Sequence, residues 1–196
     1  MATRRILVLD GHPAAPSLSA ALTAAYVEGA EAAGHDVRLA RLSALDFDMD
    51  FERASYGEAK PLEPDLERFL ADLEWCEHFV LACPMWWGGP PAKLKGLFDR
   101  ALMPGRTFDS RVPAGKMPKP LLKGRTGRAM ITSDTPRWFM RFVYGDAMVR
   151  QLRAQILGFV GIKPMPVLWC AAASHATAEA AGRWIGEARG MGAAAA

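Results

Sequence analysis

The sequence predicts an α/β fold in which a five-stranded parallel sheet carries helices on both of its faces. Short runs rich in aliphatic residues recur along the chain, and a segment with apolar residues at helical spacing follows each run. Alternation of this kind is typical of parallel strands joined by right-handed helical crossovers. Because a length of 196 residues favours one domain over two, we expect residues 1–196 to form a single domain.

The first two strands flank the first helix. Residues 6–9 (Ile-Leu-Val-Leu) are continuously apolar, as in a strand that is covered on both faces. Apolar residues then recur at helical spacing over 18–32, and Gly34 ends that helix. Residues 36–42 alternate as a second strand would, and residues 43–62 form an irregular connection that holds several acids.

Two further helices surround the third strand. Pro64 opens a helix that extends to Cys76, and acidic residues in its first turn suit the positive end of the helix dipole. Residues 79–83 (Phe-Val-Leu-Ala-Cys) form the third strand. The proline pair at 90–91 then begins a helix that continues to Ala101.

The second half of the chain is less regular. Residues 103–125 form a long loop rich in proline, glycine and lysine, and a loop of this length is usually functional or disordered. The remaining expected elements are a strand at 128–133, a helical region at 137–157 interrupted near Gly145, a strand at 165–172, a helix around 180–188 and a frayed tail at 192–196.

The composition excludes several classes of protein. With 51% hydrophobic and 23% charged residues, the chain is neither disordered, nor collagen-like, nor a coiled coil. A net charge of +3 is too small to imply nucleic-acid binding. Every apolar run is shorter than the roughly 18 residues of a membrane helix, and the basic N-terminus leads into a strand rather than a signal peptide. We therefore expect neither membrane insertion nor a nucleic-acid partner.

The cysteine and histidine residues are scattered along the chain. Cys76, Cys83 and Cys170 show no Cys-x-x-Cys spacing, which favours buried thiols in a reducing, cytoplasmic setting. The histidines form no His-x-x-x-His pair and no cluster with cysteines. We therefore predict no metal site.

Parallel sheets bind ligands at the carboxyl ends of their strands, so the loops after the first, third and fourth strands form the candidate site. The first loop places His12, Ser17 and Ser19 at the start of a helix, where unpaired N–H groups and the helix dipole favour a phosphate. Alternatively, Ser17 serves only as the helix N-cap. Asp10 suggests a phospho-acceptor pocket, but the second acid and the lysine that such a pocket needs are missing.

The loop after the third strand carries two adjacent tryptophans, Trp86 and Trp87, followed by Gly88 and Gly89. Neighbouring side chains in an extended loop point in opposite directions, so we expect one indole to face outward or into a cleft. Because glycines let the backbone approach a flat ligand closely, the segment favours a planar heteroaromatic ring. The alternative is that both tryptophans anchor a tight turn.

Residues 84–100 read Pro-Met-Trp-Trp-Gly-Gly-Pro-Pro-Ala-Lys-Leu-Lys-Gly-Leu-Phe-Asp-Arg and resemble the signature of NAD(P)H:quinone oxidoreductases of the flavodoxin-like fold. The first loop and the order of elements resemble the same family over nearly the whole chain. The resemblance implies a bound flavin (FMN or FAD), strand order 2-1-3-4-5 and a homodimer with active sites at the subunit interface. It also implies that NAD(P)H passes a hydride to the flavin and that a quinone-like acceptor then takes the same place, in a ping-pong reaction.

The resemblance assigns the cofactor contacts to three loops. The phosphate would be surrounded by His12, Ser17, Leu18 and Ser19. One side of the ring would be lined by Pro84, Met85, Trp86, Trp87 and Gly88. The pyrimidine end would be covered by Thr132, Ser133, Asp134 and Thr135.

The loop after the fourth strand departs from the family pattern. Family members carry a threonine followed by paired glycines, whereas this chain has Ser133, Asp134 and Thr135. Tyr144 stands where we align a family histidine, and Trp138 falls near a family tyrosine, so these two are the candidate catalytic residues. Alternatively, the loop only caps the next helix, and Tyr144 is an interface aromatic.

Two other functions stay open beside catalysis. Some relatives of this family act as ancillary subunits of potassium efflux systems, in which the flavoprotein is a regulatory partner. A flavin-free phospho-receiver would instead depend on Asp10. The basic residues between Arg111 and Arg128 are either a solvated loop or an attractive surface for an anion such as the NAD(P)H phosphates.

Overall fold

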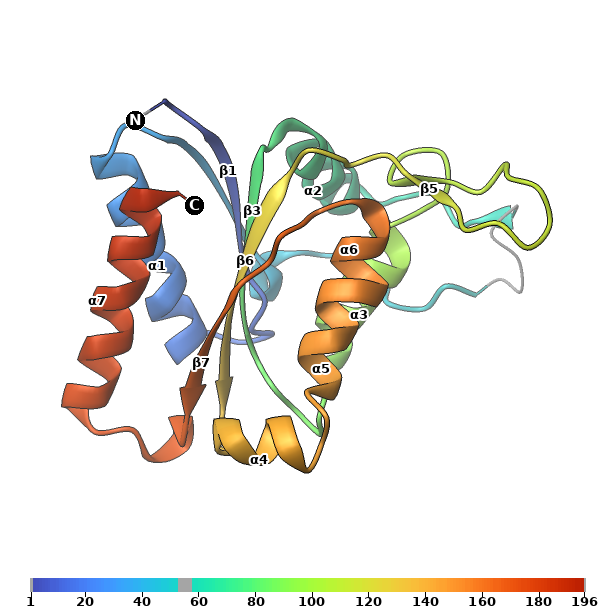
Figure 1. Ribbon diagram of the computed structural model, residues 1–196. Coiled ribbons are helices and arrows are strands. Elements are labelled where there is room, and N and C mark those ends of the chain that lie inside the picture. Colours follow the sequence, from blue (N-terminus) through green and yellow to red (C-terminus); the bar gives the residue numbers. More distant parts are fainter. Residues whose placement is uncertain (1, 53–57, 196) are drawn as a thin grey trace.

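A five-stranded parallel sheet lies at the centre of the computed structural model, which describes residues 2–52 and 58–195 (Figure 1). Its strands are β1 (Arg5–Asp10), β2 (Asp36–Arg41), β3 (His78–Pro84), β6 (Thr126–Ser133) and β7 (Val167–Ala171). They lie in the order β2-β1-β3-β6-β7, and each neighbouring pair is parallel. Counted along the sheet-forming strands this is the order 2-1-3-4-5, so the predicted fold class and strand order are confirmed.

Helices cover both faces of the sheet (Figure 1). On one face α1 (Leu18–Ala32) and α7 (Ala178–Ala194) pack against each other. The other face carries α2 (Pro64–Trp75), α3 (Ala92–Ala101), α5 (Ala147–Arg150), the π-helical segment η3 (Gln151–Ile156) and α6 (Leu157–Val160). The short elements are α4 (Arg137–Phe142), which lies beyond the carboxyl end of β6, and the 3-10 turns η1 (Leu42–Ala44) and η4 (Ala173–His175). None of the described helices is long and apolar enough to cross a membrane.

Alternate residues of the central strands point into two separate cores. Ile6 and Val8 belong to the core that α1 and α7 cover, whereas Leu7 and Leu9 belong to the core on the opposite face. All residues of β3 are buried. Burial on both faces explains why these strands are continuously apolar in the sequence.

The C-terminal segment differs from the prediction. Residues 192–194, which we expected to be frayed, are the last residues of α7. A Cβ atom on Gly192 would lie 2.1 Å from the carbonyl oxygen of Tyr26, and one on Gly29 would lie 2.0 Å from that of Arg189. The two glycines let α1 and α7 approach closely, so helix packing orders this part of the chain.

Smaller differences concern the boundaries of elements. β6 begins earlier than expected, at Thr126. β7 begins later than expected, at Val167, because Pro166 cannot donate a hydrogen bond to the sheet. The helix after β3 starts at Ala92, with the preceding proline as its N-cap. The region 137–157 is divided into α4, α5, η3 and α6, where we expected a single interruption.

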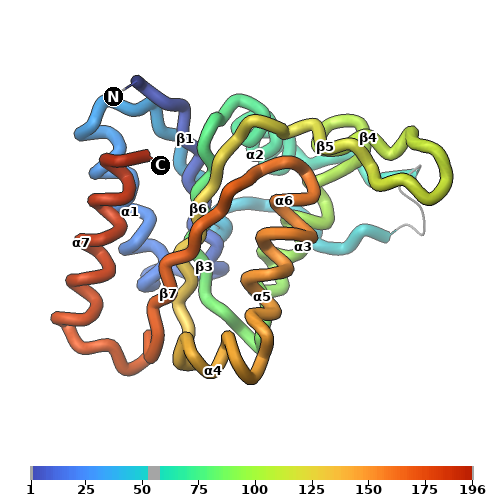
Figure 2. The backbone as a smooth tube through the Cα atoms, viewed as in Figure 1, coloured from blue at the N-terminus to red at the C-terminus, as the bar shows by residue number. Residues whose placement is uncertain are grey.

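The long loop at 103–125 contains some regular structure. Two short strands, β4 (Phe108–Asp109) and β5 (Lys119–Pro120), pair in antiparallel fashion. Figure 2 shows this segment projecting beyond α2 and α3, at the end of the molecule away from α4. Within one chain, the basic residues of this loop therefore lie away from the carboxyl ends of the strands, where we expected NAD(P)H to bind.

Candidate active site

Two cavities share part of their lining at the carboxyl ends of the strands. The first, here called the helix-side cavity, has a volume of about 300 Å³ and is lined by His12, Pro16, Ser17, Leu18, Ser19, Pro84, Met85, Trp86, Thr132, Ser133, Asp134, Ala173 and Ser174. The second, here called the aromatic cavity, has a volume of about 610 Å³ and is lined by Met85, Trp87, Gly88, Ser133, Asp134, Thr135, Met140, Tyr144 and Ala147. Met85, Ser133 and Asp134 line both cavities, so the two form one site.

Every residue predicted to contact the cofactor lines one or both of these cavities. The three loops singled out in the sequence are therefore neighbours in the folded chain. Sequence reasoning missed Pro16, Met140, Ala147, Ala173 and Ser174. Small and apolar residues of this kind give no chemical signal in a single sequence, and Ser174 follows the fifth strand, whose loop we did not consider.

Ser17 and Ser19 frame the N-terminus of α1. Ser17 is the N-cap, and its Oγ accepts a hydrogen bond of 3.1 Å from the backbone N–H of Ala20. Ser19 is buried, and its Oγ has no hydrogen-bond partner among the described residues. Because a buried hydroxyl without a partner is unfavourable, it marks a position where a ligand oxygen would restore the missing bond.

Asp10 and His12 shape the loop that precedes α1. The Asp10 carboxylate accepts a hydrogen bond of 3.1 Å from the backbone N–H of His12. Asp10 is only 1% exposed, and burial raises its pKa. A side chain buried in this way stabilises the loop and is closed to a phosphate donor in solvent, which weighs against the phospho-receiver hypothesis.

A tight turn presents Trp87 beside the aromatic cavity. Trp86 and Gly89 exchange two backbone hydrogen bonds, of 2.9 and 3.0 Å. Trp87 and Gly88 occupy the central positions with φ values of +52° and +78°, both in the left-handed region. The Trp87 side chain is fully exposed, so packing within the chain does not stabilise this conformation. Strain of this kind in a bulky residue is typical of functional sites.

The two candidate catalytic residues differ in their position. Tyr144 lines the aromatic cavity, whereas Trp138 lines neither cavity. Trp138 packs edge-on against Phe139 with 5.4 Å between ring centroids, and Phe139 packs in the same way against Tyr144 at 5.1 Å. Within one chain, Trp138 can therefore support Tyr144 through Phe139 but does not reach the cavity.

Side chains behind the aromatic cavity hold its backbone. Trp169 Nε1 donates a hydrogen bond of 3.1 Å to the carbonyl oxygen of Thr135. The guanidinium of Arg137 lies 5.3 Å from the Trp169 ring and also binds the Asp146 carboxylate. This ion pair lowers the pKa of Asp146 and raises that of Arg137, so both groups are charged at neutral pH.

Asp134 joins the loops that follow β6 and β7. Its carboxylate accepts hydrogen bonds from the backbone N–H and the hydroxyl of Ser174, at 2.8 and 2.5 Å. These bonds lower the pKa of Asp134, so the side chain is ionised at neutral pH. Among the described residues that line the two cavities, none is a lysine or an arginine, and none besides Asp134 is an acid.

None of the cysteines lines the helix-side cavity or the aromatic cavity. Cys76, Cys83 and Cys170 are free and buried, and burial raises the pKa of the Cys83 and Cys170 thiols to about 12. Protonated thiols in apolar surroundings are poor nucleophiles. Over residues 2–52 and 58–195, no group of three or more His, Cys, Asp and Glu side chains is arranged to hold a metal ion.

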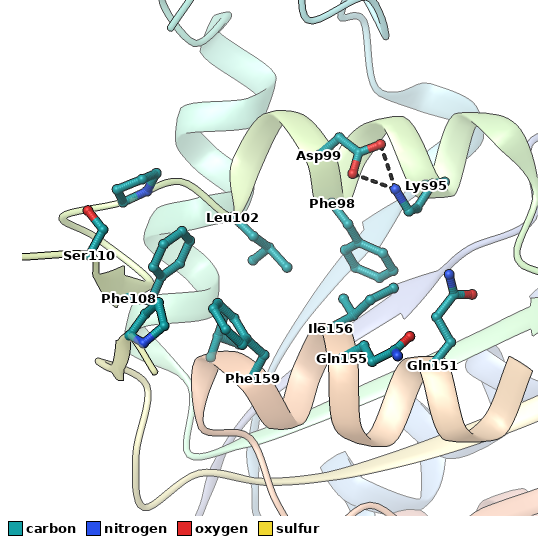
Figure 3. Close-up of a pocket in the computed structure, with 13 residues that line it drawn as sticks. Lys95, Phe98, Asp99, Leu102, Phe108, Ser110, Gln151, Gln155, Ile156 and Phe159 are labelled. Carbon is teal, nitrogen blue, oxygen red and sulfur yellow. Dashed lines mark hydrogen bonds and ion pairs between the residues drawn. The ribbon is translucent and has the colours of Figure 1, made fainter. Parts of the chain in front are cut away.

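A third cavity, here called the α3–η3 groove, has a volume of about 550 Å³ and lies outside this site (Figure 3). Phe98 on α3 and Leu102, the C-cap residue of α3, lie opposite Ile156 and Phe159, and Phe108 of β4 lies at one end. The sequence did not predict this groove because its walls come from residues 95–118 and 151–160, which are far apart in the chain.

The donor set of the site fits a flavin mononucleotide. The unpartnered Ser19 hydroxyl and the N-terminus of α1 suit a phosphate, because both offer hydrogen-bond donors to an anion. The aromatic cavity, with Trp87, Met140 and Tyr144 in its lining, suits a flat apolar ring. The shared lining would lie between the two ends of one elongated ligand.

The chain is similar to proteins of one fold family. A family model described as flavodoxin-like fold matches residues 4–187. The FMN-dependent NADH:quinone oxidoreductase 1 of Bradyrhizobium diazoefficiens is 36% identical over 133 residues, which cover 65% of this chain and 56% of that protein. The NAD(P)H dehydrogenase (quinone) 1 of Rattus norvegicus is 27% identical over 188 residues, which cover 83% of this chain and 67% of that protein. The chain thus matches only part of the length of these relatives.

A solved structure shares the fold over the whole chain. The NAD(P)H:quinone oxidoreductase from Methanothermobacter marburgensis has a TM-score of 0.81 to this chain at 20% sequence identity. The match covers 98% of each chain. At this level of identity the likeness establishes the architecture described above.

Proposed function

The chain belongs to the flavodoxin-like fold family, and from this premise we propose that it is an oxidoreductase that uses FMN and NAD(P)H to reduce quinones or similar planar acceptors by two electrons. One observation carries the proposal: hydroxyl groups at a helix N-terminus adjoin an apolar, aromatic slot at the same edge of the sheet. The names of the two relatives support this choice of cofactor and substrates. We further propose that residues 1–196 form one flavin-binding domain.

We assign the phosphate of FMN to the helix-side cavity. Ser19 would donate its unpartnered hydroxyl, and Ser17 would keep the first turn of α1 in place while its own proton stays available. His12 Nε2 would add a further donor in the tautomer in which Nδ1 accepts the 3.0 Å hydrogen bond from the Ala14 N–H, because the ring proton then lies on Nε2. Without lysine or arginine in the described lining, phosphate binding would depend on neutral donors and on the dipole of α1.

We assign the flavin ring to the aromatic cavity. The bound flavin supplies the hydride chemistry, which protein side chains do not provide. Trp87, Met140 and Tyr144 would form walls that exclude water and fix the distance between stacked rings. The Ser133 hydroxyl accepts a 3.0 Å hydrogen bond from the backbone N–H of Thr135, which leaves its own proton free to donate to a ring oxygen. Tyr144 would donate to the same end of the ring.

Donor and acceptor would use the aromatic cavity in turn. Trp87 and Tyr144 both belong to its lining, so a nicotinamide or a quinone would stack within the same walls. We therefore propose a ping-pong reaction, in which NAD(P)⁺ leaves before the quinone enters. FAD in place of FMN would need an adenine pocket, and we assign none.

We propose that the chain forms a homodimer that completes this site. Trp138, Phe142, Val143 and Tyr144 are all exposed in and after α4, and the apolar α3–η3 groove lies between α3 and the segments η3 and α6 (Figure 3). Exposed apolar surface of this extent favours coverage by a partner. Analytical ultracentrifugation should give a dimer, and Phe142→Glu should give monomers with reduced turnover.

The free thiols of the cysteines agree with a cytoplasmic setting. The three cysteines are free thiols and are all buried, a state that a reducing compartment preserves. We propose that the protein acts there on small molecules, without a nucleic-acid partner and without membrane insertion.

The proposed function is tested by identifying the cofactor and measuring turnover. Purified protein should be yellow and release FMN on heating. Initial rates with NAD(P)H and a benzoquinone should give parallel double-reciprocal lines, as a ping-pong reaction requires. Bound flavin with negligible reductase activity, together with co-purification of a potassium efflux transporter, would favour the regulatory alternative. Intersecting lines would contradict the shared binding place.

A further inference from the structure

The proposed reaction assigns no role to the negative charge of Asp134. Its side chain is exposed and lines both the helix-side cavity and the aromatic cavity. The other described lining residues include no second acid and neither lysine nor arginine, so nothing in the lining balances the Asp134 charge. Any acceptor that enters the aromatic cavity therefore meets the Asp134 carboxylate in its lining, in addition to the charge of the FMN phosphate that we assign to the helix-side cavity.

Hydrogen bonds fix this charge in place. The backbone N–H and the hydroxyl of Ser174 both donate to the Asp134 carboxylate, at 2.8 and 2.5 Å. Ser174 belongs to the short turn η4, which directly follows β7, so the carboxylate is tied to the edge of the sheet. His175, the next residue, exerts a smaller electrostatic effect on Asp134 than these bonds do.

We propose that Asp134 is a specificity-determining residue that makes the site accept uncharged or cationic acceptors and reject acceptors that carry a sulfonate or carboxylate group. The inference rests on the proposed function and names the acceptor class of that site. A fixed anion repels a second anion that comes within a few ångströms, and the repulsion is moderate here because the Asp134 side chain is exposed to water. A neutral quinone is not repelled in this way, so the Asp134 charge distinguishes neutral from anionic acceptors by repelling the anionic ones.

Asp134→Asn removes the negative charge of this side chain and keeps its shape. Asparagine keeps a carbonyl oxygen that accepts from the Ser174 N–H, so the turn is retained. The variant and the wild type are compared with 1,4-naphthoquinone and with its 2-sulfonate. We expect Asp134→Asn to raise the ratio of kcat/KM for the sulfonate to kcat/KM for the neutral quinone by about five- to tenfold, and this ratio cancels any effect of the substitution on the cofactor itself.

Two control variants test whether the rejection of the sulfonate arises from the structure of the turn or from the net charge of the protein rather than from the Asp134 carboxylate. Ser174→Ala removes one hydrogen bond but keeps the carboxylate, so rejection of the sulfonate should persist. Glu31→Gln removes an exposed carboxylate near the far end of α1, about 20 Å along the helix from its N-terminus. Glu31→Gln should leave kcat/KM for both quinones unchanged. Added salt should weaken the rejection in the wild type and have no such effect in Asp134→Asn.

A binding measurement makes the test independent of turnover. Equilibrium dialysis of each quinone against the oxidised protein, without NAD(P)H, gives dissociation constants directly. We expect Asp134→Asn to strengthen binding of the sulfonate relative to binding of the neutral quinone by about five- to tenfold. Equal changes for both quinones, or no change for either, would overturn the role of Asp134. Absence of quinone reduction in every variant would overturn the proposed function instead, while the dialysis result would still decide the role of Asp134.

Discussion

Arg137 and Asp146 form a two-pronged ion pair that encloses α4 and the turn carrying Tyr144. Arg137 Nη2 lies 2.8 Å from Asp146 Oδ2, and Nη1 contacts the second carboxylate oxygen. The backbone between them also closes on itself, since Asp146 N–H donates to the carbonyl oxygen of Met140 at 2.8 Å. The position of Tyr144 at the aromatic cavity thus depends on a pair of residues that do not line it.

Breaking this pair should affect turnover more than folding. We expect Arg137→Met to lower kcat/KM about tenfold because Tyr144 loses its fixed position, and to cost about 1 kcal/mol of unfolding free energy because the pair is partly exposed and screened. Steady-state kinetics and urea unfolding measure the two effects. Arg111→Met, which removes an exposed arginine paired with Asp109, should change neither. Full activity in Arg137→Met would show that Tyr144 needs no such support.

Replacing Trp87 should separate stability from activity. Asparagine tolerates the left-handed conformation that strains tryptophan, and the exposed indole contributes little packing within the chain. We expect Trp87→Asn to raise the unfolding free energy by about 0.5–1 kcal/mol and to lower kcat/KM about tenfold through loss of ring stacking. Thermal unfolding and NAD(P)H oxidation provide the readouts. A destabilised variant with normal kinetics would contradict both expectations.

Ser19 should matter for the phosphate and little for the fold. Because its buried Oγ has no partner, Ser19→Ala should leave the stability of the apoprotein unchanged or slightly higher. Its affinity for FMN should fall about five- to tenfold with loss of one hydrogen bond to an anion. Fluorescence titration should show unchanged affinity for riboflavin, which lacks the phosphate. Ser17→Ala is the matched variant: it should also weaken FMN binding, and unlike Ser19→Ala it should destabilise the fold by about 1 kcal/mol through loss of the N-cap.

A negative charge at the same position should prevent cofactor binding. Ser17→Asp can still cap α1, since aspartate is a preferred N-cap residue. Its carboxylate would repel the phosphate of FMN in the helix-side cavity. We expect folded protein without flavin, measured by absorbance after purification. Full flavin content in Ser17→Asp would mean that the phosphate lies elsewhere.

His78 should make folding sensitive to acid. Burial lowers the pKa of His78 to about 4 from the usual 6.5, and its Nδ1 lies 2.7 Å from Thr126 Oγ1. Between these two pH values the unfolded chain binds a proton that the folded chain does not, so stability falls as the pH decreases from 6.5 to about 4. The loss is about 3 kcal/mol at most. Urea unfolding across this range should show the decline, and His78→Asn should flatten it; an equal decline in the variant would assign the effect to other groups.

The strands and the three site loops were predictable because their signals are local. A continuous apolar run such as Phe79–Cys83 indicates a strand buried on both faces, and the adjacent Trp86 and Trp87 stand out beside two glycines. The order of the strands came from the family resemblance, since periodicity does not determine which strands are neighbours. The N-cap role of Ser17 was likewise predicted from its position before an apolar helical segment.

Features that depend on tertiary contacts were not predictable. The order of the tail near Gly192 follows from close packing against Tyr26, far away in the chain. The partnership of Asp134 with Ser174 joins loops after different strands, and no spacing rule relates them. Trp138 was chosen by alignment, but the turn of α4 directs it to Phe139 rather than to the cavity.

The most direct test of the flavin reaction is an anaerobic titration of the yellow protein with NAD(P)H, followed by a quinone. One equivalent of NAD(P)H per bound flavin should bleach the visible absorbance, and one equivalent of quinone should then restore it. Protein that remains colourless after incubation with FMN, or a visible spectrum that NAD(P)H leaves unchanged, would contradict the proposed oxidoreductase.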